Sequence, residues 1–489
     1  MTLDRLRAAL TYTDLGVMFE VRRVRTQAWR FQNEHEWKAE IQRLTALADI
    51  CLLKDAGDWY ETHSGLSDLV SRTLRTEVTK EFTYPEPGLL PFSNPPDFEP
   101  HPYQLQALEK LIAARHAGVQ MGTGLGKSLI IGLVLRRLGL KSLVLAPNTS
   151  VADQLHRVLA GWFGEKHVGT YFDSKKKIKT ITVGNAQTLT RLHPGQADYE
   201  ALRKVQVFVA DESHLCPADT LANVCFGVAS GAPYRFFFSA TQMRNDGADI
   251  LLDGITGPIV YEMSVREGIE QNYLARPWFH MTMVPSNGVQ VFTDPMKTQR
   301  HHLFYNPAVV REVGKLCNTA AQAGMPTLVL TREVEQFNRL LPYLRHPVSF
   351  AHGTLGKGDN IQPQFRKSDP NKLVAEFNAG RSQLLVGTTC ISTGTDIKPT
   401  RLLIYWQGGS SEVQVRQAIG RGTRLHPLTG KTSFHVQDFW PLSPSGDQVK
   451  IFYDNPDIRP KSWGPGNHAK ARKGIYEDIS GPGYPVDLR

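Results

Sequence analysis

Short apolar runs alternate with helical patterns along most of the chain, and the runs fall into two series. In the first series, the composition of a buried strand recurs at residues 142–146, 180–183, 205–210 and 236–239. In the second series, it recurs at 327–331, 383–387, 402–406 and 433–438. Strands that alternate with helices are typical of parallel sheets covered by helices. The pattern therefore predicts an α/β protein in which two such domains follow each other as architectural duplicates.

Prolines and breaks in the pattern divide the rest of the chain. Prolines crowd residues 84–100, which can hardly form the interior of a helix or a sheet. Ahead of them, a strand-like run at 17–24 and helical patterns at 36–53 and 66–74 indicate a small α+β accessory domain. We predict an accessory domain at 1–84, a connector at 85–100, domains at 101–276 and 300–440, an interdomain linker at 277–299 and a C-terminal extension at 441–489.

Length and composition set outer bounds. A chain of 489 residues, 41% of them hydrophobic, is long enough for about three domains with filled cores. No apolar run approaches the roughly 18 residues that span a bilayer, and no signal-like segment opens the chain. We expect a soluble protein in the cytoplasm of a bacterium or a phage-infected host, without a membrane partner. The five cysteines form no C-x-x-C pair, which argues against zinc and a disulfide framework.

A glycine-rich segment at residues 121–128 carries the clearest chemical signal. It reads Met-Gly-Thr-Gly-Leu-Gly-Lys-Ser, follows a short apolar run and precedes a helical pattern. Glycines let the backbone curl around phosphates, so that successive N–H groups point inward at the start of a helix. We predict that this turn binds ATP, with Lys127 on the β- and γ-phosphates and Ser128 on Mg²⁺. Further nucleotide contacts are expected from Thr123, Gly124 and Gly126.

A second signal is the run Asp211-Glu212-Ser213-His214. Residues 205–210 have the composition of a fully buried parallel strand, so the two carboxylates are expected at its carboxyl end, where α/β sheets bind ligands. Asp211 suits the water shell of the metal ion, and Glu212 suits the polarisation of an attacking water molecule.

The order of these and further motifs resembles that of a superfamily 2 helicase over roughly residues 100–440. The segments that carry the resemblance are the entry segment at 101–104, motif I at 121–128, motif Ia at 144–148, a DExH-type motif II at 211–214, the motif III tripeptide at 239–241, motif V at 387–396 and the Q-x-x-G-R-x-x-R pattern of motif VI at 417–424. Residues 263–274 look like the segment that closes the first motor domain in double-strand DNA translocases. This segment and the small domain ahead of the motor make the chain similar to phage UvsW-like and XPB-like DNA helicases.

The resemblance implies two tandem RecA-like domains and roles for individual residues. Gln104 would read the adenine, and Asp396 would bind the nucleotide. Arg421 and Arg424 would act as arginine fingers on the spread negative charge of the transition state. Four residues are expected to couple hydrolysis to motion, namely His214, Ser239, Thr241 and Gln417. Three positions are expected to contact the nucleic-acid backbone without reading sequence, namely Asn148, Gln187 and Thr388.

Basic residues outside the motifs are further candidates for nucleic-acid contact. In the N-terminal region, Arg22, Arg23 and Arg30 are interleaved with aromatic residues, which suits phosphate contact plus base stacking. An amphipathic core element with a solvated basic face fits the same pattern. Lys175 and Lys176 begin a cationic run that we expect in a loop, where such runs are usually only solvated. The net charge of +9 modestly favours a polyanionic partner.

Together these patterns predict an ATP-dependent DNA helicase or translocase that remodels duplex or branched DNA, with possible replication or recombination proteins as partners. An ATP-dependent RNA helicase is the first alternative. The second is an ATP-gated DNA clamp or loading factor that switches conformation without processive unwinding. No cluster of carboxylates with a lysine supports a nuclease.

Overall fold

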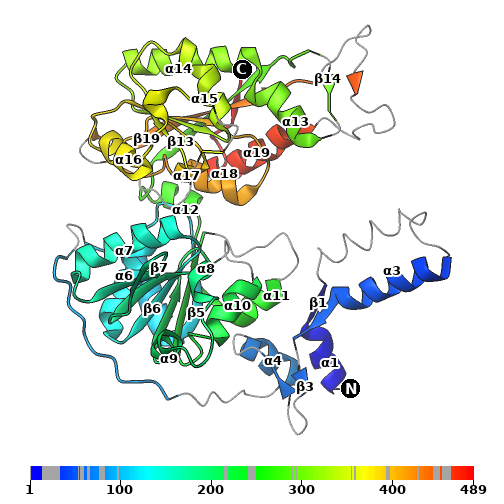
Figure 1. The fold of residues 1–489 in the computed structure, drawn as a ribbon, viewed down its shortest axis with the longest axis vertical. Coiled ribbons are helices and arrows are strands. Elements are labelled where there is room, and N and C mark those ends of the chain that lie inside the picture. The colour runs from blue at the N-terminus through cyan, green and yellow to red at the C-terminus, as the bar shows by residue number, and fades with distance from the viewer. Residues whose placement is uncertain are drawn as a thin grey trace. The chain divides into compact units, whose positions relative to one another are not determined.

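The structure of the chain is a computed structural model. It describes residues 2–13, 34–52, 54–55, 60–62, 66–75, 83–95, 99–213, 218–240, 249–288, 290–292, 294–353, 355–356, 360–392, 397–426, 429–443, 452–453 and 464–489. The chain divides into two compact units, which are both drawn in Figure 1. Unit 1 comprises Met1–Met121 and Gly126–Glu262, and unit 2 comprises Gly122–Leu125 and Met263–Arg489.

Unit 1 contains an eight-stranded sheet in the order β12-β5-β11-β10-β6-β9-β7-β8. Its strands are β5 (His116–Met121), β6 (Ser142–Ala146), β7 (Val168–Phe172), β8 (Lys175–Lys177), β9 (Ile181–Asn185), β10 (Val207–Ala210), β11 (Tyr234–Ser239) and β12 (Ile259–Met263). The pairs from β5 across to β7 are parallel, and β8 runs antiparallel to β7. The first predicted series corresponds to β6, β9, β10 and β11, which confirms the α/β fold of this half.

Helices connect the strands of this sheet and lie against it, as Figure 1 shows for α6 and α7. They are α5 (Pro102–Ala114), α6 (Lys127–Leu138), α7 (Thr149–Phe163), α8 (Ala186–Leu189), α9 (Ala197–Leu202), α10 (Ala218–Phe226) and α11 (Asp249–Thr256). Helix α6 is apolar almost all round and is therefore largely buried. It ends at Gly139, whose positive φ of 60° suits a residue without a Cβ atom.

The N-terminal region of unit 1 consists of short elements. They are α1 (Thr2–Ala9), β1 (Thr11–Thr13), α3 (Glu34–Ala48), β2 (Asp49–Cys51), β3 (Lys54–Asp55), β4 (Tyr60–Glu61) and α4 (Ser67–Leu74). The predicted helical patterns correspond to α3 and α4, whereas the strand-like run at 17–24 lies outside the described residues. Leu6, Leu10 and Leu66 are buried in the same hydrophobic cluster as residues of the first sheet such as Phe208. The accessory region is therefore packed into unit 1.

The proline-rich connector is irregular, as predicted, but it is fastened to two helices. The Gly88 amide donates to the carbonyl of Leu138 at the end of α6, at 2.7 Å. The Ser93 amide donates to the carbonyl of Trp162 near the end of α7, also at 2.7 Å. The ring of Phe92 packs against Trp162, with 5.9 Å between the centroids. The connector thus satisfies carbonyls that the helix ends leave without an intrahelical partner.

Unit 2 contains a seven-stranded sheet in the order β16-β17-β15-β18-β19-β13-β21. Its strands are β13 (Arg276–Val284), β15 (Thr327–Thr331), β16 (Ser349–Ala351), β17 (Leu384–Gly387), β18 (Leu402–Trp406), β19 (Ser433–Pro441) and β21 (Asp487–Leu488), and all these neighbours are parallel. A separate pair joins β14 (Gln290–Val291) to β20 (Phe452–Tyr453). The second predicted series corresponds to β15, β17, β18 and β19, which confirms the second α/β domain.

The helices of unit 2 follow the same plan. They are α12 (Val265–Glu270), α13 (Pro295–Gln299), the π-helix η4 (Arg300–Phe304), α14 (Pro307–Gln322), α15 (Val334–Leu340), the 3-10 helices η5 (Leu341–Tyr343) and η6 (Pro363–Phe365), α16 (Pro370–Asn378), α17 (Thr389–Ser392), α18 (Glu412–Ile419) and α19 (Gly464–Ser480). Figure 1 shows α19, in red, beside α18.

Two predicted boundaries are wrong. The predicted linker at 277–299 is regular structure, because residues 277–284 belong to β13 and residues 295–299 to α13. Its three prolines lie where they are tolerated, at the second residue of β13, directly after that strand, and at the first position of α13. Residues 263–274, expected to close the first domain, group with unit 2, as do residues 122–125.

The C-terminal segment is an integral part of unit 2. Helix α19 lies on β13 and β19, where Arg472 forms a fully buried ion pair with Asp438, with 2.7 Å between Nε and Oδ2. Tyr476 donates its hydroxyl proton to the same carboxylate at 2.8 Å and stacks on Phe279. The predicted extension at 441–489 is thus anchored to the sheet over its described residues 464–489.

Candidate functional site

The glycine-rich turn joins β5 to α6 and has a backbone conformation that favours glycine at two positions. Gly124 and Gly126 have φ values of 97° and 80°, a conformation that residues with a Cβ atom rarely adopt. Gly126 is the N-cap of α6, so the first amides of this 12-residue helix point out of the turn. The positive end of the helix dipole and these amides fit a phosphate group.

Gln104 lies beside this turn, as predicted for a residue that contacts the nucleotide. It is buried in the first turn of α5, and its Oε1 accepts the His101 amide at 2.9 Å, which completes a capping box. A Cβ atom on Gly126 would lie only 2.4 Å from Gln104 Nε2. The Gln104 amide therefore both caps α5 and borders the turn.

The structure brings Lys127 together with the two carboxylates of motif II. Lys127 is buried in the first turn of α6, and its Nζ donates to the Met121 carbonyl at 3.1 Å. The same Nζ lies 3.3 Å from Glu212 Oε1. Asp211 and Glu212 directly follow β10, at the carboxyl edge of the sheet, as the sequence predicts. The predicted catalytic cation and both carboxylates therefore form one site in unit 1.

Burial governs the chemistry of the Asp211 carboxyl group. Burial and then the negative charge of Glu212 raise the pKa of Asp211 well above its ordinary value, against the opposing effect of Lys127. The Glu212 amide donates to Asp211 Oδ1 at 3.0 Å. Glu212 itself has a φ of 48°, which is uncommon for a residue other than glycine and typical of functional sites. A carboxylate so hidden from water suits a divalent cation, which would favour its charged form.

Motif II is fastened to the neighbouring strand that carries motif III. The Ser213 hydroxyl is fully buried and donates to the Phe238 carbonyl of β11 at 3.3 Å. Ser239 ends β11 and is also fully buried. Because β10 and β11 are parallel neighbours, the ends of both strands lie on one edge of the sheet. Ser239 is thus close enough in the fold to respond to changes at motif II.

Unit 2 holds the residues of motif VI in a tight turn after α18. Gln417 is buried in the last turn of α18, and Arg421 is 5% exposed in the segment that follows. Arg424 is half-buried. The Phe434 ring fills the space beside Gly422, where a Cβ atom would lie 2.0 Å from the ring. The glycine therefore lets the arginine-bearing turn pack directly onto β19.

Two helix starts of unit 1 form a candidate nucleic-acid surface. Asn148 is the N-cap of α7 and accepts the Val151 amide at 3.0 Å. Asn185 is the N-cap of α8, and its Nδ2 donates to Thr149 Oγ1 at 2.9 Å. Gln187 in the first turn of α8 is exposed. Because β6 and β9 are parallel neighbours, both helices begin at the same edge of the sheet.

The lysine run was predicted in a loop, and this prediction is wrong. Lys175–Lys177 form β8, which pairs antiparallel with β7 at the end of the sheet. Lys176 is exposed, with its Nζ 5.5 Å from the centroid of the Tyr171 ring. The turn before β8 adjoins the start of α7, since Thr149 Oγ1 donates to Asp173 Oδ1 at 3.2 Å. The hairpin therefore extends the surface formed by the helix starts.

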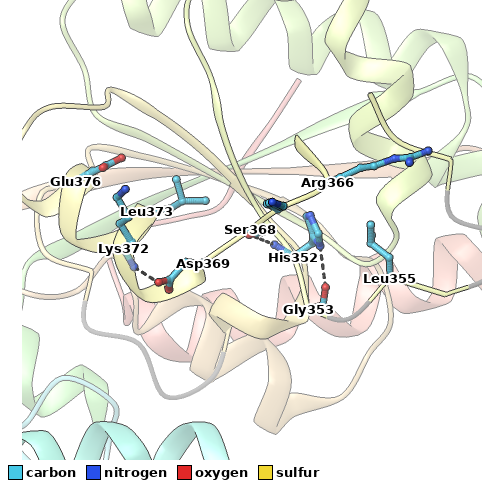
Figure 2. A pocket seen from close by; sticks show the side chains of 10 residues that line it. His352, Gly353, Leu355, Arg366, Ser368, Asp369, Lys372, Leu373 and Glu376 are labelled. Carbon is cyan, nitrogen blue, oxygen red and sulfur yellow. Dashed lines mark hydrogen bonds between the residues drawn. The ribbon is translucent and has the colours of Figure 1, made fainter. Parts of the chain in front are cut away.

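In unit 2, Thr388 is bonded to the end of β16, the strand that leads into a cavity that was not predicted from the sequence. Its amide donates to the Ala351 carbonyl at 3.0 Å, which joins the ends of β17 and β16. The cavity, of about 620 Å³, begins at His352 directly after β16 (Figure 2). Its lining residues are His352, Gly353, Leu355, Arg366, Lys367, Ser368, Asp369, Lys372, Leu373 and Glu376. Cations outnumber carboxylates, so the cavity suits an anionic group.

The geometry of this cavity is fixed by hydrogen bonds that Figure 2 shows in part. The His352 ring lies between two carbonyls, with Nδ1 2.7 Å from Gly353 O and Nε2 2.7 Å from Phe365 O. The His352 amide donates to Ser368 Oγ at 3.1 Å. The cationic pair Arg366-Lys367 shortly after a buried strand was the sequence signal that could have revealed it.

Several predicted site residues lie outside the described residues. They are Arg22, Arg23, Arg30, His214, Thr241 and Asp396. The side chain of Lys175 is likewise not described, and Ser128 is half-buried in the first turn of α6. Among the described residues, no group of three or more His, Cys, Asp or Glu side chains could hold a metal ion. No helix in the described part of the chain is long and apolar enough to cross a membrane.

Two family models match the chain. The family described as type III restriction enzyme, res subunit, matches residues 97–244, and the helicase conserved C-terminal domain matches residues 310–426. The first match contains the glycine-rich turn and motif II, and the second contains Thr388, the cavity and motif VI.

Similar proteins agree with these matches. The DNA 3'-5' helicase XPB of Kineococcus radiotolerans is 26% identical over 353 residues, which are 68% of this chain and 59% of that protein. The probable helicase D10 of Escherichia phage T5 is 23% identical over 335 residues, 65% of this chain and 71% of that protein. The chain thus spans about three fifths of the XPB relative.

A solved structure supports the fold. S. cerevisiae Dbp5 bound to RNA and ADP BeF3 has a TM-score of 0.51 and 18% identity, and the match covers 78% of this chain and 88% of that chain. Two RecA-like domains and the resemblance to XPB-like and phage helicases are therefore confirmed at the level of the family. The narrower UvsW-like assignment stays a prediction.

Proposed function

Because the chain belongs to the superfamily 2 helicases, we propose that it hydrolyses ATP to translocate along DNA and to remodel duplex or branched DNA. The observation that carries the proposal is the convergence of Lys127, Asp211 and Glu212 beside a glycine turn shaped for phosphates. A structural salt bridge alone would not require left-handed glycines or a left-handed Glu212 at the same edge of the sheet.

The residues of unit 1 fit ATP with Mg²⁺ in distinct roles. Amides at the start of α6 bind phosphate oxygens, and Lys127 shifts from its apo contacts with Met121 and Glu212 to the phosphates. Ser128 and Asp211 would hold Mg²⁺, which would supply positive charge to the phosphate oxygens. Glu212 would accept a hydrogen bond from the attacking water molecule and orient it.

The arginines of motif VI complete the catalytic set. Arg421 and Arg424 supply planar guanidinium groups to the negative charge that spreads over the transition state. Gln417 and Ser239, which are both buried, would report the state of the nucleotide to the rest of each unit, since Gln417 belongs to motif VI and Ser239 ends the strand next to motif II. Asp396, His214 and Thr241 keep the roles that the family resemblance implies for them.

The nucleic-acid path that we propose uses contacts to phosphates. In unit 1, it includes the starts of α7 and α8, with Asn148 and Gln187, and the exposed Lys176 of the hairpin. In unit 2, it includes Thr388 and the cationic cavity after β16. None of these features reads bases, so they fit movement along any sequence. We propose DNA rather than RNA as the substrate because an XPB-type DNA helicase is among the similar proteins.

ATP hydrolysis with different nucleic acids tests the proposal. We expect single-stranded, duplex or forked DNA to stimulate turnover more than RNA of the same length, and Lys127→Ala to abolish turnover with each. Stimulation by RNA alone would establish the alternative of an RNA helicase. The fold match to Dbp5 bound to RNA is compatible with this alternative. Stimulated hydrolysis without strand displacement, branch migration or displacement of a bound protein would favour the clamp.

A further inference from the structure

Four basic side chains gather at the amino-terminal edge of the second sheet. Lys398 and Arg401 precede β18, while His426 and Lys431 precede its parallel neighbour β19. Thr388 and the cavity of Figure 2 follow β17 and β16, so they lie at the opposite, carboxyl-terminal edge. We call these four residues the cationic cluster. It is separate from the proposed nucleic-acid contacts of unit 2.

Hydrogen bonds hold the two parts of the cationic cluster together. Lys431 Nζ donates to the Lys398 carbonyl at 2.9 Å, and Arg401 Nη2 donates to the Thr429 carbonyl at 2.8 Å. His426 Nδ1 lies 2.8 Å from Thr429 Oγ1, and the Lys431 amide donates to the His426 carbonyl at 3.2 Å. The cations are therefore held close to one another by neutral partners.

The described groups that shift the pKa values of Lys431 and His426 are positively charged. Lys431 is 1% exposed, and burial, followed by the positive charges of Arg401 and Arg424, lowers its pKa to about 7. Burial and then Lys431, Lys398 and Arg401 lower the pKa of His426. Among the described residues, no carboxylate contributes to either shift. A buried lysine that only stabilised the fold would be expected to have an anionic partner.

We propose that the cationic cluster is a binding site for a phosphate group. Lys398 is exposed and Arg401 is half-buried, so both can contact a ligand directly. Lys431 lies behind them and adds positive charge when an anion arrives. An arginine beside a lysine suits phosphate, because charge-assisted hydrogen bonds from a guanidinium group match its oxygens. The phosphate could belong to inorganic phosphate and pyrophosphate or to a nucleic-acid backbone, and the proposal goes beyond the motor function above.

Anion binding by the full chain with Lys127→Ala tests this proposal independently of the glycine-rich turn. Pyrophosphate and a short single-stranded oligonucleotide are titrated by calorimetry, with chloride at matched ionic strength as the reference. We expect Lys398→Met and Arg401→Met each to weaken binding by about tenfold, the scale of one charge-assisted hydrogen bond. Lys315→Met is the matched control, because Lys315 is an exposed lysine that pairs with Glu312 on α14.

Lys431→Met separates a binding role from a structural one. If the cluster binds phosphate, binding of an anion near neutral pH is accompanied by uptake of a proton. The uptake is measured as a binding heat that depends on the ionisation enthalpy of the buffer. Lys431→Met should remove this uptake while the chain stays folded. A loss of pyrophosphate binding alone in Lys398→Met and Arg401→Met identifies free phosphates as the source, and a loss of oligonucleotide binding alone in these variants identifies the backbone. The proposal is overturned if neither anion binds beyond the chloride reference, or if Lys398→Met and Arg401→Met bind like Lys315→Met.

Discussion

Two of the buried cations of unit 2, Arg472 and Lys431, lie in opposite surroundings. Arg472 is fully buried and donates two hydrogen bonds to the Asp438 carboxylate and one to the Gly409 carbonyl. The Tyr476 hydroxyl donates to the same carboxylate. Its pKa is raised, because the attraction of Asp438 outweighs the effect of burial. Lys431 is equally hidden, but it meets a carbonyl and two further cations, and its pKa is lowered to about 7.

The difference distinguishes a buried cation that stabilises the fold from a buried cation that destabilises it. A buried ion pair with all its hydrogen bonds made costs little once formed, and breaking it is strongly unfavourable. A buried cation without an anion weakens the fold and persists where function needs it. Lys127 differs from both, since it has an anionic partner in Glu212 that we propose it leaves on binding ATP.

The largest effect is expected at Lys127. Lys127→Ala removes the phosphate contact and should abolish ATP hydrolysis and weaken ATP binding, while the unfolding midpoint stays near that of the wild type. Glu212→Gln keeps the turn intact and should also abolish hydrolysis, yet retain ATP binding. Steady-state ATPase assays and binding of a fluorescent ATP analogue distinguish the two. Turnover close to wild type in either variant would refute the assignment of this site.

The next largest effect is expected at Arg421, another buried cation in unit 2. Arg421→Ala should lower the turnover number by about 10³-fold with little change in ATP affinity, which is the scale of an arginine finger. Arg421→Lys should not restore activity, because an ammonium group cannot reproduce the planar fork of a guanidinium group. A variant that turns over normally but binds ATP weakly would instead make Arg421 a ground-state binding residue.

The sequence predicted the parts of this picture that rest on local pattern. The strands at 142–146, 327–331 and 402–406 are found at the predicted residues, because a buried parallel strand is apolar on both faces and is bounded by turns. The glycine turn and motif II were readable because their chemistry depends on neighbouring residues along the chain.

The features that the sequence did not reveal depend on contacts between distant segments. Strand β13 contains a proline and lies far from its partner β19 in sequence, so its register could not be predicted. The lysines of β8 look like a solvated run until their pairing with β7 is known. The Arg472 ion pair spans 34 residues, and the cationic cluster joins two segments that are separately unremarkable.

Asp438 tests the structural half of the comparison. Asp438→Asn preserves the shape of the side chain but leaves the Arg472 charge without an anion, so the free energy of unfolding should fall by about 3–5 kcal/mol. Chemical denaturation measures the loss. Glu477→Gln on the same helix is the control, because Glu477 pairs with Lys473 at the surface, and it should change stability by less than about 0.5 kcal/mol. Equal effects of the two substitutions would mean that the buried pair does not anchor α19.

Lys431→Met is the smallest and most discriminating change, because it should stabilise the chain. Methionine keeps the length of the side chain without the buried charge, and such replacements can stabilise proteins by about 1–4 kcal/mol. Between the folded pKa of about 7 and the unfolded value of 10.5, the unfolded chain binds the Lys431 proton and the folded chain does not. Stability of the wild type therefore rises with pH across this window, relative to the variant.

The gain from Lys431→Met should consequently be full below pH 7 and should fade as the pH approaches 10.5. Guanidinium unfolding curves at several pH values, in buffers free of phosphate, measure this dependence. Lys315→Met, which alters an exposed lysine, should show no such trend. A Lys431→Met variant that is less stable than the wild type at pH 6 would place Lys431 with Arg472, as a cation that holds the fold, and would remove the contrast on which the phosphate site depends.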